Sequence, residues 1–433
     1  TGTSDVFAKK KEKVQTEAKS DTVRTASKKR NTQYPRLFKN KRVVTKKGLI
    51  TIHKIDDKLY FEFPKSLLGR EFLMGSSISA TSDNTSGLVG QTMTTPLHIR
   101  FAIQEDQVYM QNVTPVSRMD VYSNQSDISK AVAKSNITPD MESFKIAAYN
   151  MDSTAVVFEV TKFFLADNKR LPLFDQNSSS LEDEKYGQLE LKAVLKKNLS
   201  SIRNFYVFDD NLEINLDMSF YQSLLASKKE VRGGNVRVKA VYSMLLLPEE
   251  TMVWRLGDPR LGYTFTKKQK ISTEKDGTAF SYLQHKWNLL PADEEAYRRG
   301  DLVAPRKPVV FYIDSDFPEA WKKAIKEGVN WWNEAFKMAG FKDAVQTADF
   351  PANDTTFYAG NLKYSCIRYV PVNLSKTQSK VWVDPRSGEI INGTIFVGHD
   401  IAKTIASQRF VQTAQVDERM RGIQLSEEVL LEG

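Results

Sequence analysis

The sequence changes its hydrophobic period once, between residues 291 and 308, and this change divides the chain into two kinds of structure. Before it, apolar residues recur at every second position in many short runs, which predicts β-strands. After it, the longest run repeats at three- and four-residue steps, which predicts a helix. The segment between is polar and contains prolines, as connectors do.

The pattern of the front part of the chain predicts large antiparallel sheets. Residues 48–63 alternate around Asp56-Asp57 and predict a hairpin, and residues 97–113 alternate on both sides of a turn. Further strand-like runs lie at 143–150, 155–165, 203–220 and 236–248. Segments 180–197 and 200–202 predict a short helix. We therefore expect a small β region at 34–95 and an antiparallel β-rich domain at 96–290.

The pattern of the back part, 291–433, predicts an α/β domain, so the whole chain is expected to be α+β. Strands are expected at 308–314 and 363–372, a hairpin at 381–400 turning at Pro385–Gly388, and a final amphipathic helix at 402–416. The clearest helix runs from Pro318 to Gly340. Proline is tolerated in the first turn of a helix, and glycine is a common residue at its C-terminal end. Trp321 and Trp332 fall on its apolar face and are expected in the core. Trp331 lies about 100° away and is expected to contact a neighbouring domain.

The charge of the chain is concentrated at its front. Residues 1–47 contain 15 Lys and Arg against 4 Asp and Glu; because the whole chain carries +9 and this segment +11, the remainder carries −2. Residues 1–33 contain few large apolar residues and predict a disordered basic tail. The tail is interpreted as a solvated linker, since no aromatic residues interleave its Lys run for base stacking. Thr1 predicts that an upstream segment has been removed.

The sequence contains no complete catalytic constellation. No HExxH, nucleophile elbow, P-loop or dinucleotide motif occurs, and no two of the four histidines are spaced to share a helix face. The single cysteine, Cys366, lies among alternating apolar residues and predicts a buried thiol. Asp-Pro-Arg occurs at 258–260 and 384–386; both predict turns in which Asp accepts backbone N–H groups, with a binding role for Arg260 or Arg386 as the alternative.

Several separated segments carry a resemblance. These are GLITIHKIDDKLYFEFPKSLLGREFLMGSSIS (48–79), LLLPEETMVWRLGDPRLGYT (245–264), FPEAWKKAIKEGVNWWNEAFKMAGF (317–341), SCIRYVPV (365–372) and VDPRSGEIINGTIFVGHDI (383–401). In this order, they resemble a family of large secreted bacterial zinc-dependent metalloproteases. In that family, two regions of unknown function precede a zincin catalytic domain.

The resemblance implies peptide-bond hydrolysis by the intact protein, with zinc as cofactor and a peptide or protein as substrate. In the family, an HExxH helix follows soon after a stretch like 410–433, so the zinc ligands and general-base Glu are not among these residues. The resemblance therefore assigns this chain no catalytic residue and no metal ligand, and it predicts an inactive chain. The resemblance makes residues 291–433 a partial zincin-like α/β domain. The partner of this chain would be the missing C-terminal part of the catalytic domain. It also implies a secreted, periplasmic or outer-membrane-associated bacterial protein.

The strand preceding the expected metal-binding helix, Gly393–His399, is the candidate edge of the zincin cleft. An extended substrate pairs with such an edge through main-chain hydrogen bonds. The predicted substrate-binding residues are Thr394, Phe396 and Gly398. The alternative is that this strand is a hairpin arm buried in the sheet.

Two other functions remain open. A non-enzymatic cell-surface protein would use its β-sheets to bind peptide or glycan without metal. A nucleic-acid-binding protein would use the basic tail and show strongly salt-dependent binding. The near-neutral remainder of the chain disfavours the second, so we expect no nucleic-acid partner.

Overall fold

A computed structural model describes most of the chain. The described residues are 33–83, 87, 89–90, 92–113, 119–121, 130–131, 134–135, 137–174, 181–183, 185, 187–271, 278–351, 357–371, 378–421 and 426–433. Strand accounts for 46% of the structure and helix for 21%, which confirms a β-rich α+β chain with a large antiparallel sheet. None of the helices in these ranges has the length and apolar character needed to cross a bilayer.

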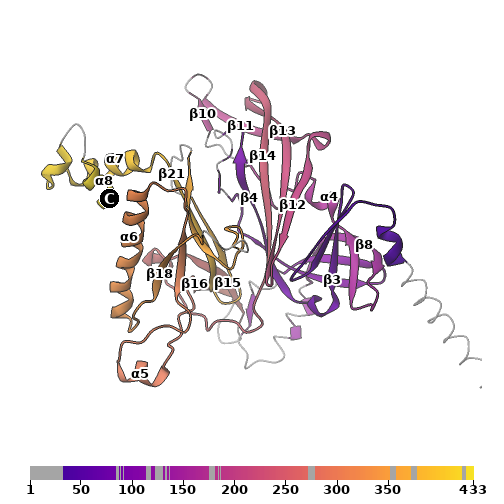
Figure 1. Ribbon diagram of the computed structural model, residues 1–433, viewed down its shortest axis with the longest axis horizontal. Coiled ribbons are helices and arrows are strands. Elements are labelled where there is room, and N and C mark those ends of the chain that lie inside the picture. Colours follow the sequence, from indigo (N-terminus) through magenta and orange to yellow (C-terminus); the bar gives the residue numbers. More distant parts are fainter. Residues whose placement is uncertain are drawn as a thin grey trace, which may run out of the picture.

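Thirteen strands form one antiparallel sheet in the order β1-β2-β3-β9-β8-β6-β5-β4-β14-β13-β11-β10, with β12 also paired to β13. Figure 1 shows the long strands β4, β13 and β14 standing at the centre of the molecule. The strands are β1 (Val43–Lys47), β2 (Thr51–Ile55), β3 (Lys58–Pro64), β4 (Glu71–Thr81), β5 (Leu97–Gln104), β6 (Gln107–Asn112), β8 (Asp140–Tyr149), β9 (Ala155–Glu159), β10 (Leu181–Asp183), β11 (Gly187–Leu195), β12 (Ser201–Val207), β13 (Asn211–Ala226) and β14 (Lys229–Leu246).

The large sheet curls, so that β1 comes close to β12 and one apolar core fills the inside. The Leu49 amide, just after β1, donates to the carbonyl of Phe208, just after β12, at 2.6 Å. Alternation supplies the core: in β13, Leu212, Ile214 and Leu216 point inward. Strand β4 pairs with both β5 and β14, so residues 34–95 and 96–290 share one sheet and one core. The boundary predicted near residue 95 is therefore not a structural division.

The predicted hairpins at 48–63 and 97–113 are present, with tight turns at Asp56-Asp57 and Glu105-Asp106. The short helix predicted at 180–197 is wrong. Residues 187–195 form strand β11, which pairs with β13 and buries alternate residues. The short helices of this part are η1 (Lys65–Leu67), α4 (Thr161–Phe164) and η2 (Lys197–Leu199), and residues 33–38 are helical.

A small sheet and a short helix connect the two halves. The sheet has the order β16-β15-β7, and its strands are β7 (Met119–Val121), β15 (Phe265–Ile271) and β16 (Thr278–Gln284). Before it lies η3 (Pro259–Leu261), and after it lies α5 (Glu294–Arg299). Asp293 caps α5 by accepting the Ala296 amide, and Gly300 ends it at φ 91°.

The back half contains a five-stranded sheet in the order β18-β17-β19-β21-β20. Its strands are β17 (Val309–Ile313), β18 (Val345–Asp349), β19 (Ser365–Val370), β20 (Gln378–Val383) and β21 (Ile390–Gly398). The first four in spatial order run parallel, and only β20 is antiparallel to its neighbour. Strand β18 was not expected, whereas the hairpin β20–β21 turns where predicted.

Helix α6 (Glu319–Met338) covers one face of this sheet, and the large sheet lies against the other (Figure 1). As predicted, Trp321, in the first turn of α6, packs against the apolar cluster of the sheet that contains Ile313 and Ile367. Trp332 does not pack as predicted: it is 65% exposed, close to the 68% of Trp331. It continues the inward stripe of α6, but no described element covers it.

The chain continues past the helix expected to be last. Helix α7 (Ile401–Thr413) is followed by η4 (Glu418–Arg421) and α8 (Glu427–Glu432). Ser426 caps α8 by accepting the Val429 amide. Helix α7 follows the C-terminal end of β21, and α8 contacts both α7 and α6, so the two helices lie beside one end of α6 (Figure 1).

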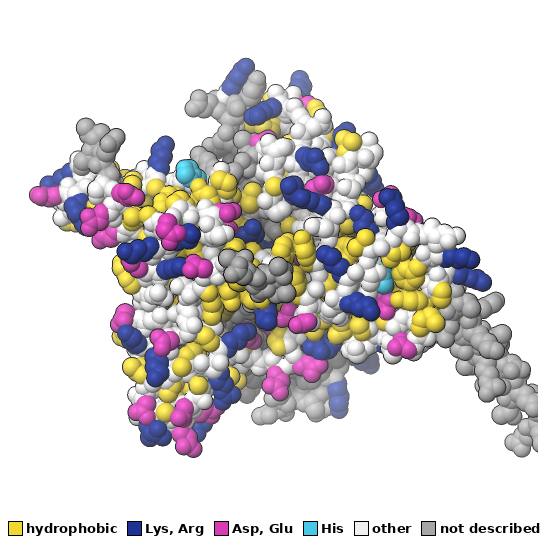
Figure 2. Space-filling view, in the orientation of Figure 1, with side chains coloured by type: hydrophobic (Ala, Val, Ile, Leu, Met, Phe, Trp, Pro, Cys, Tyr) yellow, Lys and Arg dark blue, Asp and Glu magenta, His cyan; other side chains and the backbone are white. Residues whose placement is uncertain are grey.

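The surface drawn in Figure 2 mixes basic and acidic side chains over both halves of the molecule. This agrees with the near-neutral charge of the chain after residue 47. The predicted disordered tail, 1–33, lies almost wholly outside the described residues, which begin at Gln33.

Candidate functional site

A cavity of about 510 Å³ lies between the large sheet and the five-stranded sheet. Strands β4, β12, β13 and β14 form one wall, and β19, β20 and β21 form the other. Four charged residues line it: Arg203, Glu213, Arg368 and Lys380. Because charged groups are rarely buried without partners, this cavity is the chemically unusual place in the described structure.

Strand pairing brings the cavity residues of the five-stranded sheet to one face. Lys380 lies opposite Thr394, and Arg368 lies opposite Phe396. Directly paired residues share a face, as do residues two apart on one strand. Lys380, Thr394, Phe396 and Arg368 therefore all point toward the large sheet. Trp382, on the same face, anchors the contact against Leu73, Leu245 and Leu247.

The opposite wall carries the buried carboxyl of Glu213. Its Oε1 accepts hydrogen bonds from the Tyr358 hydroxyl at 2.5 Å and from Asn215 Nδ2 at 2.8 Å. Burial raises the pKa of Glu213, although these hydrogen bonds and the charges of Lys380 and Arg368 act against the rise. Burial and the neighbouring carboxyl likewise raise the pKa of Tyr358. Tyr358 therefore stays a hydrogen-bond donor.

Lys380 places a buried ammonium in the same cavity. Among the described residues, its Nζ donates one hydrogen bond, to Ser77 Oγ at 3.2 Å, and lies 5.2 Å from the Trp382 ring centroid. Burial lowers the pKa of Lys380 to about 8; Glu213 opposes the shift and Arg368 adds to it. An ammonium has three donors, so this one retains hydrogen-bonding capacity.

Arg368 is the second cation of the cavity face. Its guanidinium lies over the Phe396 ring, 5.8 Å from the centroid. Its Nε is buried and has no hydrogen-bond partner, because the nearest carboxylate oxygen, Oδ2 of Asp314, is 3.9 Å away. Lys380 and Arg368 therefore both line the cavity, and Arg368 Nε remains a buried donor whose ion-pair partner Asp314 lies beyond hydrogen-bond distance.

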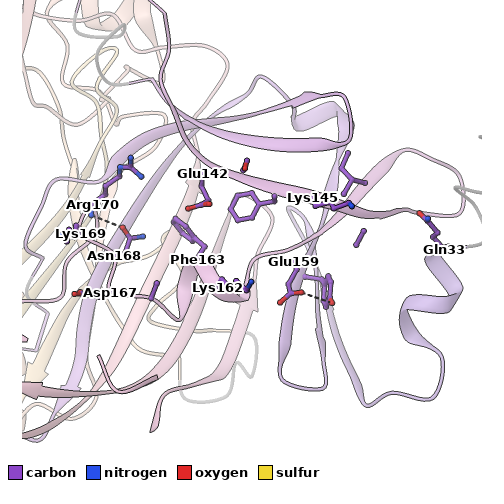
Figure 3. A pocket seen from close by; sticks show the side chains of 16 residues that line it. Gln33, Glu142, Lys145, Glu159, Lys162, Phe163, Asp167, Asn168, Lys169 and Arg170 are labelled. Carbon is purple, nitrogen blue, oxygen red and sulfur yellow. Dashed lines mark hydrogen bonds between the residues drawn. The ribbon is translucent and has the colours of Figure 1, made fainter. Parts of the chain in front are cut away.

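A second hollow, of about 930 Å³, opens on the large sheet beside α4. Figure 3 shows its rim of charged side chains, from β8, β9 and the segment after α4. Four are basic and three acidic: Lys145, Lys162, Lys169, Arg170, Glu142, Glu159 and Asp167. All seven are exposed or half-buried. Because water screens such charges, this hollow shows no comparable site.

The predicted substrate-binding residues are only partly brought together. Thr394 and Phe396 line the cavity, whereas Gly398 pairs with Val370 at the end of β21. The prediction that this strand is the sheet edge is wrong, because β21 lies between β19 and β20 and pairs with both. Its alternative, a hairpin arm within the sheet, describes the structure. The edge on this side is β20.

The described residues do not fit a zinc centre. His53 bonds Glu62 at 2.9 Å, His98 bonds Glu71 at 2.8 Å, and His285 bonds Thr266 at 2.9 Å. His399 bonds the Tyr369 hydroxyl and stacks on Trp321. Within the described ranges, no three His, Cys, Asp or Glu side chains are grouped to hold a metal ion. We therefore derive no chemical step through zinc from these residues.

Both Asp-Pro-Arg segments form the predicted turns. Asp258 accepts the Arg260 amide, and Asp384 accepts the Arg386 amide, each at 2.9 Å. Arg260 is exposed, but Arg386 also donates to the Pro248 carbonyl at 2.7 Å. The second turn therefore ties the β20–β21 hairpin to the large sheet. Cys366 is buried as predicted, and burial raises its pKa to about 12.

Comparison with known families covers the front part of the chain. Residues 32–81 match "Domain of unknown function (DUF5118)", and residues 90–292 match "Domain of unknown function (DUF5117)". These ranges contain β1–β4 and β5–β16, and they stop before the five-stranded sheet. Neither a curated protein nor a solved structure was found to match the chain.

Sequence reasoning missed Glu213, Arg368 and Lys380. Glu213 belongs to a polar stripe on β13, which includes Asn211, Asn215 and Asp217 and looks like a solvated sheet face. The segment before β19 covers part of this stripe, because Asn361 accepts a hydrogen bond from Asn211 and Tyr358 donates one to Glu213. The available signal was that Lys380 lies two residues before Trp382 in a strand-like run, so that the two side chains share one face.

Proposed function

We propose that this chain is the non-catalytic front portion of a secreted zinc-dependent metallopeptidase. The five-stranded sheet with α6 would be the upper half of the zincin catalytic domain. The large curled sheet would be a scaffold, a pro-region or a platform that recruits substrate. In this proposal the zinc ligands come from a segment outside these 433 residues, and the protein is periplasmic, secreted or attached to the bacterial outer membrane.

The observation that carries the proposal is the layout of the five-stranded sheet. It is parallel except for one antiparallel strand, β20, at its edge, and one long helix backs it. Such an edge is where an extended peptide adds to a sheet. The layout supports a zincin cleft in which β20, in place of β21, is the edge strand that pairs with an extended substrate.

The uncovered apolar surface of α6 supports the same proposal. Trp332 lies seven residues after Ile325, two helical turns along the same stripe. Ile325 packs against the sheet, whereas Trp332 is largely exposed. Large exposed apolar side chains next to a core mark a surface that another element covers. A further helix on this face would cover it.

The proposal is tested by comparing two lengths of the protein. The purified 433-residue chain should contain no stoichiometric zinc and hydrolyse no peptide. The reading frame past Gly433 should encode HExxH within a few tens of residues, and the longer product should bind zinc and cleave peptides. Zinc with turnover in the 433-residue chain would show that the ligands were misplaced.

A second candidate is a non-enzymatic surface protein that binds a peptide or glycan. The cavity between the sheets favours it, because the cavity needs no metal to bind a ligand. It predicts a longer reading frame without HExxH. A nucleic-acid-binding role has less support, since charge is mixed on the surface in Figure 2.

A further inference from the structure

We propose that the cavity between the two sheets binds a small organic acid, whose carboxylate lies between Lys380 and Arg368. Its apolar body would lie against Phe396 and the stacked rings of Tyr206 and Tyr358. This site is independent of the proposed peptidase function, because every residue that it uses belongs to the described chain.

The charge balance of the cavity favours an anion. Three cations line it, Arg203, Arg368 and Lys380, against the single carboxyl of Glu213. Arg203 is exposed and lies where solvent reaches, whereas Lys380 is buried. A buried charge is costly unless it is paired. The carboxylate of a ligand would supply the missing negative charge.

The unused hydrogen-bond donors favour a carboxylate in particular. Arg368 Nε is buried without a partner, and Lys380 Nζ has Ser77 Oγ as its one acceptor among the described residues. Both side chains rise from the same sheet face, on strands separated only by β21. The two oxygens of one carboxylate could accept from two donors on one sheet face.

The walls of the cavity suit an apolar body attached to that carboxylate. Tyr206 and Tyr358 stack with ring centroids 4.2 Å apart, and Phe396 stands on the opposite wall. Val89, Val241 and Pro371 add further apolar surface. A volume of about 510 Å³ falls within the range of about 300–1,000 Å³ that small-molecule sites occupy.

The competing interpretation is that Glu213 is the structural counter-ion of Lys380. The contacts of Glu213 argue against it, because its Oε1 is already engaged by Tyr358 and Asn215. No hydrogen bond joins Glu213 to Lys380 within the described structure. If Glu213 neutralises Lys380, Arg368 still has Asp314 as its carboxylate only at 3.9 Å, beyond hydrogen-bond distance, and Arg203 adds positive charge at the exposed side of the cavity.

Isothermal titration calorimetry of the 433-residue chain with 4-phenylbutyrate tests the site. We expect saturable binding at pH 7, no binding of 4-phenylbutyramide, and weaker binding of inorganic phosphate. Lys380→Met should weaken 4-phenylbutyrate binding about 10- to 100-fold, the usual worth of a charged hydrogen bond. Lys342→Met removes the same charge from an exposed surface position and should bind like the wild type.

Thermal melting separates loss of the site from loss of the fold. Lys380→Met replaces a buried charge by an apolar chain of similar length, so its Tm should equal or exceed that of the wild type. Unchanged affinity in folded Lys380→Met would overturn the proposal. So would equal binding of the acid and its amide, a preference for phosphate, or no binding to the wild type at millimolar concentration.

Discussion

Lys380 is the residue whose ionisation most directly couples the cavity to the stability of the fold. Burial lowers its pKa from 10.5 to about 8, while Ser77, Glu213, Arg368 and Trp382 face it. Between these pH values the unfolded chain binds the proton and the folded chain does not. Stability therefore rises with pH in this window, by roughly 1.4 kcal/mol per pH unit for this group.

Lys380→Met should abolish that contribution. Urea unfolding of wild type and variant at pH 7.5, 8.5 and 9.5 measures it: the wild type should gain stability relative to the variant as pH rises. Lys342→Met is the control and should follow the wild type. Parallel curves for Lys380→Met and wild type would mean that the ammonium is not desolvated.

Single residues were predictable from sequence where their neighbours along the chain decide their environment. Cys366 lies in a strand where apolar and polar residues alternate, and this alternation predicted its burial. Trp332 lies on an apolar stripe, but it is 65% exposed because no described element covers it. Lys380 and Glu213 meet only because two sheets pack together, which no local pattern encodes.

At the level of elements, local turn chemistry was enough to predict the hairpins. The β2–β3 turn has two residues, and Asp56 adopts φ 53°, a conformation that Asp tolerates. Sheet order was not predictable in this way. Strand β21 follows β20 in sequence but inserts between β20 and β19, which moved the edge by one strand. Strand β11 resembled a helix because its outward positions carry Glu and Lys.

The two Asp-Pro-Arg turns give a matched pair for a second prediction. Asp384 is fully buried and holds Arg386, which reaches the large sheet, whereas Asp258 holds an exposed Arg260. Removing one partner of a buried ion pair costs about 3–5 kcal/mol, and an exposed pair about 0–1 kcal/mol. Since Arg386 is partly exposed, Asp384→Ala should cost about 3 kcal/mol, whereas Asp258→Ala should leave the free energy of unfolding almost unchanged.

Urea denaturation of both variants measures this difference. Asp384→Asn should fall between them, because the amide oxygen still accepts the Arg386 amide while the charge is lost. Equal losses for Asp258→Ala and Asp384→Ala would show that the second turn does not fasten the hairpin to the large sheet.

The surface of α6 gives a third prediction, which depends on the proposed metallopeptidase. In the 433-residue chain, Trp332→Ser should change stability by less than about 0.5 kcal/mol, because the side chain is largely exposed. In the longer product it should lower the melting temperature and reduce peptidase activity. Lys337→Ser, at an exposed position of the same helix, is the control. A strong effect in the 433-residue chain would mean that Trp332 is already packed.

At the scale of the molecule, the large sheet and the five-stranded sheet are held face to face. Strand β4 pairs with β5, the next strand in sequence, and with the distant β14, so residues on both sides of the first predicted boundary share one sheet. The strands of the five-stranded sheet all follow the change of hydrophobic period near residue 300. The sequence does not show how the large sheet contacts the five-stranded sheet. This contact consists of the apolar cluster around Trp382 and the charged cavity.

Trp382 is the residue on which that contact depends most. It is fully buried and packs on Leu73, Leu245 and Leu247 of the large sheet. Trp382→Ala should cost about 3–5 kcal/mol and split thermal unfolding into two transitions, because the sheets lose their shared core. Calorimetry and tryptophan fluorescence measure both effects.

Trp382→Phe separates the role of the contact from that of the indole N–H. Trp382 Nε1 is buried without a partner, so phenylalanine removes an unsatisfied donor while keeping most of the apolar contact. We expect one transition and a loss of less than about 2 kcal/mol. Trp331→Ala, which removes an exposed indole, should unfold like the wild type. If Trp382→Ala still unfolds in the same manner as the wild type, the two sheets are coupled mainly through the charged cavity and the Arg386 turn.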